Sequence, residues 1–336
     1  MSCAEHLTAP GLRDRTERFD RSQKRHTGAM SEFVPDPLLR GLLMGSGAGP
    51  ADPGMARRIV SLTGKPAADV EVLYLGTATY DQLEPRERQC AGLAGLGCRI
   101  TPLDVARRTP AGHEAEEALG RADVILASGG NTLYAMDRWA ASGVDERLRR
   151  AAGQGVVICG GSAGAICWFD GGHSDSMDPT SYLHPVPEGD PGATSWRYLR
   201  VDGLGLLPGL VCPHFDRTQG NGVLRARDFE QMMLRHSGEV GLGLDNWAGL
   251  LIDGDTYEVV YPEGMVGSND GGRFEPEEGL PGLWLMEVVD GAVVARLAPS
   301  SGRLGEILRP ASHIDPDPMV AACRAANPGH AAAALR

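Results

Sequence analysis

The stretch Gly155-Val156-Val157-Ile158-Cys159-Gly160-Gly161-Ser162-Ala163-Gly164 joins a short apolar run to a serine that small residues surround. An apolar run of this length is typical of a buried strand, and the Gly-x-Ser-x-Gly spacing is typical of a sharp strand-to-helix turn. Larger side chains beside the serine would collide with the neighbouring strand or the following helix. The turn would lift the Ser162 hydroxyl clear of the sheet, next to the first free N–H groups of the helix. The stretch therefore predicts a nucleophile at a strand end, and its alternative is a glycine-rich turn without chemistry.

Apolar runs and amphipathic stretches alternate along the chain before this turn. We expect strands over Leu39–Met44, Val70–Leu75, Cys98–Leu103 and Val124–Ser128, and helices over Met55–Leu62, Glu84–Leu96, Glu114–Leu119, Leu133–Ala141 and Asp145–Ala152. Strands that alternate with helices and are apolar throughout predict an α/β fold, in which a mainly parallel sheet carries helices on both faces. In such sheets the loops at the carboxyl ends of the strands form the functional site.

The second half of the chain is less regular. Residues 170–195 are rich in Gly, Ser, Asp and Pro and predict a long loop, which is usually functional in a compact domain. Beyond it we expect strands over Tyr198–Val201, Leu206–Cys212, Val240–Leu244, Gly249–Ile252 and Tyr257–Tyr261, a helix over Arg225–His236, and a hairpin of Leu283–Val289 with Ala292–Leu297. The expected organisation is a disordered leader over residues 1–37, one domain over 38–298, and a weakly ordered tail over 299–336.

Composition narrows the class of protein. The 336 residues carry a formal net charge of −12, and the sequence pI is near 5.2. An acidic surface repels phosphate backbones, so nucleic acid is not expected as a partner, and no apolar stretch predicts a membrane span. The seven cysteines are odd in number and form no Cys-x-x-Cys pair. This pattern favours reduced cysteines in a cytoplasmic protein over a disulfide framework or a zinc site. The first 29 residues lack the apolar segment of a secretory signal.

A serine hydroxyl needs an adjacent base to act as a nucleophile. Among the nine histidines, His214 directly follows the apolar run Leu210-Val211-Cys212. That position predicts a base at the same edge of the sheet as Ser162. The alternative is a structural histidine.

A third group should orient the imidazole of the base. Asp245 follows the apolar run Val240–Leu244 and is our preferred candidate, although the neighbouring Asn246 could fill the same place. Other aspartates are rivals: Asp175, Asp178 and Asp216. The resulting order of serine, histidine and acid differs from that of α/β-hydrolases, which disfavours that fold.

Three blocks resemble the dipeptidase E (aspartyl dipeptidase) and cyanophycinase family of serine peptidases. They are Ser128-Gly129-Gly130-Asn131-Thr132, Gly160-Gly161-Ser162-Ala163-Gly164-Ala165 and Cys212-Pro213-His214-Phe215-Asp216. Their order and spacing also match, and the similarity covers roughly residues 38 to 298. The resemblance implies a three-layer α/β/α domain like that of class I glutamine amidotransferases, with serine in place of cysteine at the elbow.

The resemblance also implies roles for individual residues. It makes Ser162 the nucleophile and His214 the base, and it places an oxyanion hole at the backbone N–H groups of Gly130 and Ala163. Family members carry the third member either in the loop after the serine, where this chain has Asp175, or in a later segment. That segment reads Leu244-Asp245-Asn246-Trp247-Ala248-Gly249 here, so the family's acid falls on Asn246 or one place early on Asp245.

The resemblance implies short peptides as substrates, some with an N-terminal aspartate. Such a side chain would bind an arginine, and Arg225 and Arg227 are candidates beside the alternative of surface helix residues. Asn131 is a further candidate for substrate binding. The turn Gly45–Gly49 does not predict a nucleotide site, because Pro50 interrupts the Gly-x-Gly-x-x-Gly pattern.

We therefore expect a cytoplasmic serine-type dipeptidase or exopeptidase that needs no metal or cofactor and is a monomer or homodimer. One alternative is a cyanophycinase-like, isopeptide-cleaving or specialised-metabolite hydrolase. Another is a weakly active amidotransferase-like domain that binds a peptide.

Overall fold

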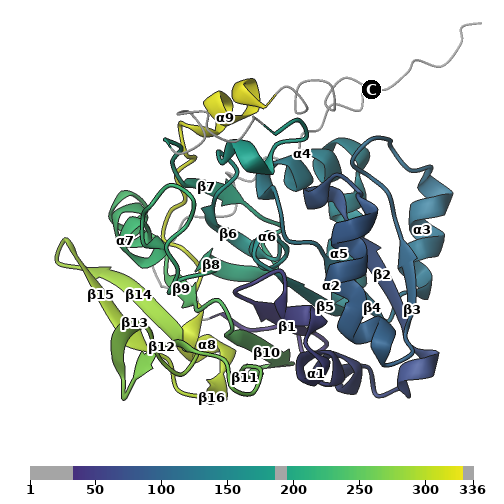
Figure 1. Cartoon of the computed structure of the whole chain (residues 1–336), viewed down its shortest axis with the longest axis horizontal. Helices are drawn as coiled ribbons and strands as arrows, with labels where there is room; N and C mark the ends of the chain where they lie inside the picture. The colour runs from purple at the N-terminus through teal and green to yellow at the C-terminus, as the bar shows by residue number, and fades with distance from the viewer. Residues whose placement is uncertain (1–32, 186–194, 328–336) are drawn as a thin grey trace, which may run out of the picture. The chain divides into compact units, whose positions relative to one another are not determined.

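The computed structural model describes residues 33–185 and 195–327. The expected leader therefore lies outside the described residues up to position 32, as do residues 186–194 of the expected loop and 328–336 of the expected tail. Figure 1 shows the arrangement of the helices and strands.

The first sheet has eight strands in the order β16-β11-β10-β1-β5-β4-β2-β3. Its strands are β1 (Arg40–Met44), β2 (Glu71–Leu75), β3 (Arg99–Pro102), β4 (Val124–Ala127), β5 (Val157–Gly161), β10 (Gly249–Asp253), β11 (Thr256–Val260) and β16 (Ser301–Arg303). β1 to β5 run parallel, and β10, β11 and β16 extend the sheet antiparallel from β1. The parallel strands match the expected ones to within two residues at each end.

Helices cover both faces of this sheet. They are α1 (Pro53–Thr63), α2 (Leu83–Gly95), α3 (Gly112–Arg121), α4 (Thr132–Ser142) and α5 (Val144–Gly153). Neighbouring residues along each strand point to opposite faces. Val72 packs in the apolar cluster that includes α1 and α2, whereas Leu73 packs in the cluster that includes α3, α4 and α5. The expected three-layer α/β/α arrangement is confirmed for this sheet.

A second sheet has six strands in the order β15-β14-β9-β8-β6-β7. Its strands are β6 (Phe169–Ser174), β7 (Leu199–Asp202), β8 (Leu207–Cys212), β9 (Gly241–Leu244), β14 (Leu283–Val289) and β15 (Ala292–Leu297). Leu210 of β8 packs with α7 (Arg225–Arg235), and Val211 packs in the large cluster shared with the first sheet. The strand before Ser162 and the strand before His214 thus belong to different sheets, joined through the short helix α6 (Ala163–Ile166) and β6.

Two expectations from the sequence differ from the structure. β6 overlaps the first residues of the expected loop 170–195. Gly172 lets β6 lie close to β8, since a β-carbon there would be 2.6 Å from the Val211 oxygen. Part of the expected tail is also ordered, since β16 pairs with β11 and Leu304 and Cys323 are buried. These segments are too short or too polar to show a period, and tertiary pairing defines them.

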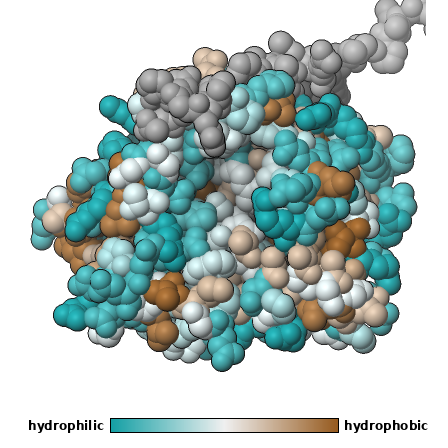
Figure 2. All heavy atoms as spheres, viewed as in Figure 1, coloured by the Kyte–Doolittle hydropathy of each residue, from teal (hydrophilic) through white to brown (hydrophobic). Residues whose placement is uncertain are grey.

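The remaining elements are short. They are a hairpin of β12 (Gly267–Asp270) and β13 (Arg273–Gly279), the helices α8 (Leu304–Ile307) and α9 (Val320–Ala326), and the 3₁₀ turns η2 (Gly49–Ala51), η3 (Ala67–Asp69), η4 (Thr77–Thr79) and η5 (Pro179–Ser181). Within the described ranges, no helix has both the length and the apolar character that a bilayer crossing requires. Figure 2 shows a face covered mostly by hydrophilic residues, with apolar residues in small separate groups.

Candidate active site

Ser162 lies at the turn from β5 into α6. Its backbone has φ 56° and ψ −122°, a region that residues with a side chain rarely adopt. Its neighbours have no room for a side chain, because a β-carbon at Gly161 would lie 1.8 Å from the Ser46 oxygen and one at Gly164 would lie 2.1 Å from the Ala127 oxygen. The close packing of this turn against the segments at the ends of β1 and β4 therefore requires small residues around the serine.

The backbones of Ser162 and His214 are fixed to consecutive carbonyl groups at the end of β1. The Ser162 N–H donates to the Met44 oxygen at 3.1 Å, and the His214 N–H donates to the Gly45 oxygen at 3.1 Å. His214 follows β8 and also has a positive φ, 51°. This pair of bonds brings the predicted nucleophile and base, which follow strands of different sheets, to one strand end.

Asn246, and not Asp245, contacts the imidazole. The His214 Nδ1 lies 2.6 Å from Asn246 Oδ1. An amide oxygen only accepts, so the proton is on Nδ1 and the Nε2 lone pair is available as a base.

The Asp245 carboxylate lies on the other side of this turn. It accepts hydrogen bonds from the Ser268 N–H at 2.7 Å, the Ser268 hydroxyl at 2.8 Å and the Gly282 N–H at 2.8 Å. Our preference for Asp245 as the orienting residue is therefore not what the geometry shows. Asp245 and Asn246 directly follow β9, which ends at Leu244. Side chains of successive residues in extended backbone point to opposite sides, so these two side chains diverge.

Burial, and next the charge of Arg225, lowers the pKa of His214 to about 4, against the opposing hydrogen bond to Asn246. The imidazole is thus neutral at neutral pH, as a general base must be. Burial, and next the charge of Asp216, raises the pKa of Asp245 to about 7.

Two backbone N–H groups near this turn have no acceptor in the described part of the chain. One is that of Ala163, next to Ser162, and the other is that of Gly130, whose neighbour Gly129 would place a β-carbon 3.5 Å from the Ser162 β-carbon. The flanking amides are occupied: the Gly129 N–H donates to Gln89 Oε1 at 3.0 Å, and the Asn131 N–H donates to the Ala78 oxygen at 2.8 Å. These bonds fix the loop after β4 and leave the Gly130 amide available for an anionic oxygen.

Arg225 is completely buried and already has partners. Its guanidinium donates to Asp175 Oδ2 at 3.1 Å, to His173 Nδ1 at 3.3 Å and to the His173 carbonyl oxygen. The His173 Nε2 in turn lies 2.9 Å from Asp228. Asp175, an alternative orienting acid, therefore pairs with Arg225 rather than with His214.

Three other candidates also have local partners. Asn131 caps α4 by accepting from the Tyr134 N–H at 3.0 Å. Arg227 is exposed and pairs with Glu230 at 3.4 Å. Asp178 accepts from the Thr180 N–H at 2.9 Å. The structure does not bring these side chains onto Ser162 or His214.

The sequence analysis missed the contribution of the Gly45–Gly49 turn. A β-carbon at Gly45 would lie 2.0 Å from the Asp245 oxygen, and the Gly45 N–H donates to the Ala248 oxygen at 2.9 Å. The glycines permit backbone contact between the two sheets. Their position at a strand end was the available signal.

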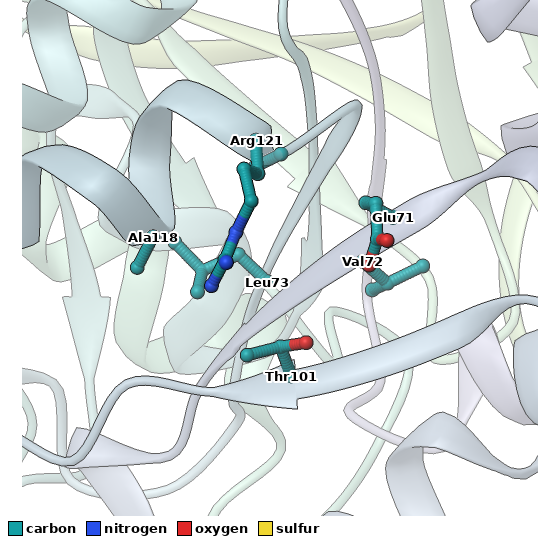
Figure 3. A pocket seen from close by; sticks show the side chains of 7 residues that line it. Glu71, Val72, Leu73, Thr101, Ala118 and Arg121 are labelled. Atoms are coloured by element: carbon teal, nitrogen blue, oxygen red, sulfur yellow. The ribbon is translucent and has the colours of Figure 1, made fainter.

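Two pockets flank the first sheet. The pocket in Figure 3 lies at the start of β2, away from the strand ends that carry Ser162, and Arg121 extends into it from α3. The other lies beyond the carboxyl ends of β2 and β3, and its lining residues are Tyr80, Asp81, Gln82, Leu83, Asp104, Arg107 and Arg108. The second lies on the same edge of the sheet as Ser162.

Comparisons with known proteins show the family and the fold of this chain. The model of peptidase family S51 matches residues 42–260. A Trypanosoma brucei brucei protein named G2/mitotic-specific cyclin-1 is 30% identical over 313 residues, covering 82% of this chain and 90% of that protein, and this similarity concerns sequence alone. The uncharacterized peptidase YgaJ of Bacillus subtilis (strain 168) is 32% identical over 145 residues, or 43% of this chain and 54% of its own length. A solved peptidase from an acI-B1 Actinobacterium shares the fold, with a TM-score of 0.52 and 17% identity over 81% of this chain and 98% of that one.

Proposed function

Because this chain belongs to peptidase family S51, we propose that it is a serine-type peptidase that hydrolyses dipeptides or other short peptides. The observation that carries this proposal is the pair of bonds from Ser162 and His214 to the consecutive carbonyls of Met44 and Gly45. It supports a nucleophile and a base that act on one bond.

In the proposed reaction, Ser162 Oγ attacks the scissile carbonyl carbon while His214 Nε2 takes the hydroxyl proton. The N–H groups of Gly130 and Ala163 stabilise the resulting oxyanion. His214 then donates this proton to the leaving amine, and the C–N bond breaks to leave an acyl-enzyme. Water, deprotonated by His214, hydrolyses the ester and restores Ser162.

Asn246 has a defined part in this scheme. Its Oδ1 holds the Nδ1–H tautomer of His214, which leaves the Nε2 lone pair available as the base. An amide does not stabilise the imidazolium as a carboxylate does, and exchanging the acid of a triad for its amide lowers turnover by ~10⁴-fold in a known case. The presence of Asn246, where a triad has an acid, favours a second candidate function, a weakly active domain that binds a peptide.

The charged residues near His214 bear on the N-terminal residue of the substrate. An N-terminal aspartate would need a cation, and the described arginines nearest His214 in sequence, Arg217 and Arg225, both pair with carboxylates. We propose short peptides in general, with an N-terminal aspartate as one class to be tested. The proposed chemistry uses no metal, and we propose a cytoplasmic monomer or homodimer.

The test is hydrolysis of a dipeptide panel by the wild type and by Ser162→Ala, both in EDTA. The panel contains Asp-Leu, Asp-Ala, Glu-Leu, Ala-Leu and β-Asp-Arg. Cleavage by the wild type alone, with fluorophosphonate labelling of Ser162, is expected. Cleavage of β-Asp-Arg only would favour an isopeptidase, loss of activity on chelation would contradict the mechanism, and neither cleavage nor labelling would favour the binding domain.

A further inference from the structure

Asn246 is held in place by a buried carboxylate. Its backbone N–H donates to Asp216 Oδ1 at 2.6 Å, and Asp216 is 1% exposed. A hydrogen bond to an ionised acceptor is stronger than one between neutral groups, and a bond this short is typical of that kind. The turn that carries the orienting amide is therefore fixed by an acid outside the Ser-His-Asn set.

Three hydrogen bonds join the turn after β8 to the turn after β9. Besides the bond from Asn246 to Asp216, the Phe215 N–H donates to the Leu244 oxygen at 3.0 Å, and His214 Nδ1 donates to Asn246 Oδ1 at 2.6 Å. Residues 214–216 and 244–246 thus form a closed network. Within the described residues, Asp216 is the carboxylate that accepts from the Asn246 N–H, so its loss would remove one of the three bonds that link the two turns.

The charge of Asp216 is only partly compensated. Its Oδ2 has no hydrogen bond in the described ranges, and its cationic neighbour, the Arg217 Nε, lies 3.3 Å away without hydrogen-bond geometry. Of the nearby acids, Glu277 adds negative charge, and Asp245 does so when it is ionised. Burial raises the pKa of Asp216, against the Asn246 N–H and the Arg217 charge. An acid two residues from His214 therefore lies in a poorly solvated place.

This inference rests on the proposed peptidase function: we propose that Asp216 is a positioning residue of the site, which acts through Asn246. Its carboxylate holds the Asn246 main chain so that Oδ1 stays on His214 Nδ1. It also supplies, at a distance, negative charge that the asparagine lacks when His214 becomes an imidazolium.

The two contributions have different sizes. For the charge, we take a separation of about 7 Å, the longest distance between α-carbons two residues apart, as the scale. At that separation and an effective dielectric constant of ~20, the interaction of two unit charges corresponds to a rate factor of about 50. Misplacing a catalytic group by about 1 Å costs ~10²-fold. Asp216→Asn keeps an acceptor for the Asn246 N–H and removes only the charge. Asp216→Ala removes both.

The experiment measures kcat and KM on the best dipeptide of the panel for the wild type and both variants. It also measures the imidazole ¹⁵N and Nδ1 proton signals of His214 by NMR. We expect kcat to fall 10- to 50-fold in Asp216→Asn and at least ~10²-fold in Asp216→Ala, with KM within about threefold. The hydrogen-bonded Nδ1 proton should persist in the Asn variant and be lost in the Ala variant.

Glu239→Gln is the matched control. Glu239 is 3% exposed and pairs with Arg200 at 2.7 Å, before β9 begins, whereas Asn246 lies beyond the other end of that strand. It should lose stability and retain both kcat and the Nδ1 proton. Asp216→Ala with kcat within threefold of this control, or with the Nδ1 proton intact, would overturn the proposal.

The NMR signals distinguish a failure of this proposal from a failure of the proposed function. A wild type that neither cleaves peptides nor labels at Ser162 refutes the peptidase, while loss of the Nδ1 proton in Asp216→Ala still supports positioning. Should the Ala variant not fold, a kcat of Asp216→Asn within threefold of the wild type would refute the contribution of charge.

Discussion

Replacing Ser162 by glycine should stabilise the protein while it abolishes hydrolysis. Ser162 has φ 56° and ψ −122°, and a residue with a side chain in such a region costs about 1–3 kcal/mol. Ser162→Ala keeps the β-carbon and the strain, whereas Ser162→Gly removes both. Glycine loses about 0.5–1 kcal/mol more chain entropy on folding. We therefore expect the glycine variant to exceed the alanine variant by about 0.5–2 kcal/mol in unfolding free energy.

The comparison is made between two inactive variants so that loss of the hydroxyl cancels. Urea unfolding gives the difference if the slopes agree, and the thermal midpoint should rise by about 2 °C per kcal/mol in a chain of this size. Ser61, within α1, is the control: there glycine should be less stable than alanine by about 0.8–1 kcal/mol. If Ser162→Gly is no more stable than Ser162→Ala, the backbone at this turn stores no strain and our argument for a forced elbow fails.

Three further predictions concern the loops around Ser162. A β-carbon at Gly130 would lie 2.3 Å from a backbone oxygen, so Gly130→Ala should displace an oxyanion donor and lower kcat ~10²–10³-fold. The control is Gly97→Ala, at a glycine with φ +91° and open space around it, which should keep the kcat of the wild type. Equal kcat values for the two variants would contradict the role of Gly130 in the oxyanion hole. Asn246→Asp places a carboxylate on His214 Nδ1 and should raise the pKa of His214 from about 4 to about 5–7. The acid limb of the pH profile of kcat/KM should therefore move to higher pH, and a limb that stays in place would count against this contact. The pKa of Asp245 is raised to about 7, so the native state holds its proton more tightly than the unfolded state, and stability from this group is lost as pH rises from about 4 through 7. The stability advantage of the wild type over Asp245→Asn should therefore shrink between pH 5 and pH 8 in urea unfolding, and a growing advantage would show that the ionised form is favoured.

The sequence predicted those parts of the molecule that have a local signal. The apolar runs of the parallel strands and the small residues around Ser162 reflect constraints within a few residues, namely burial on two faces and close backbone contact. His214 could be placed by the same logic, because it directly follows an apolar strand. Each of these features was visible without knowledge of its neighbours.

The parts that the sequence did not predict depend on contacts between distant segments. Asp245 and Asn246 follow the same strand, and which of them meets His214 depends on where β9 ends, since one residue of register exchanges the two sides. The burial of Arg225 depends on Asp175 and His173, fifty and more residues earlier. No periodicity in a short stretch records such pairings.

The bonds of Met44 and Gly45 carry a consequence for sequence change at the end of β1. An insertion or deletion of one residue there would shift the supports of the serine and the histidine together, with neither able to adjust alone. The His214 amide proton forms the bond that links the end of β8 in the second sheet to the end of β1 in the first, so its hydrogen exchange reports whether the two sheets remain joined there.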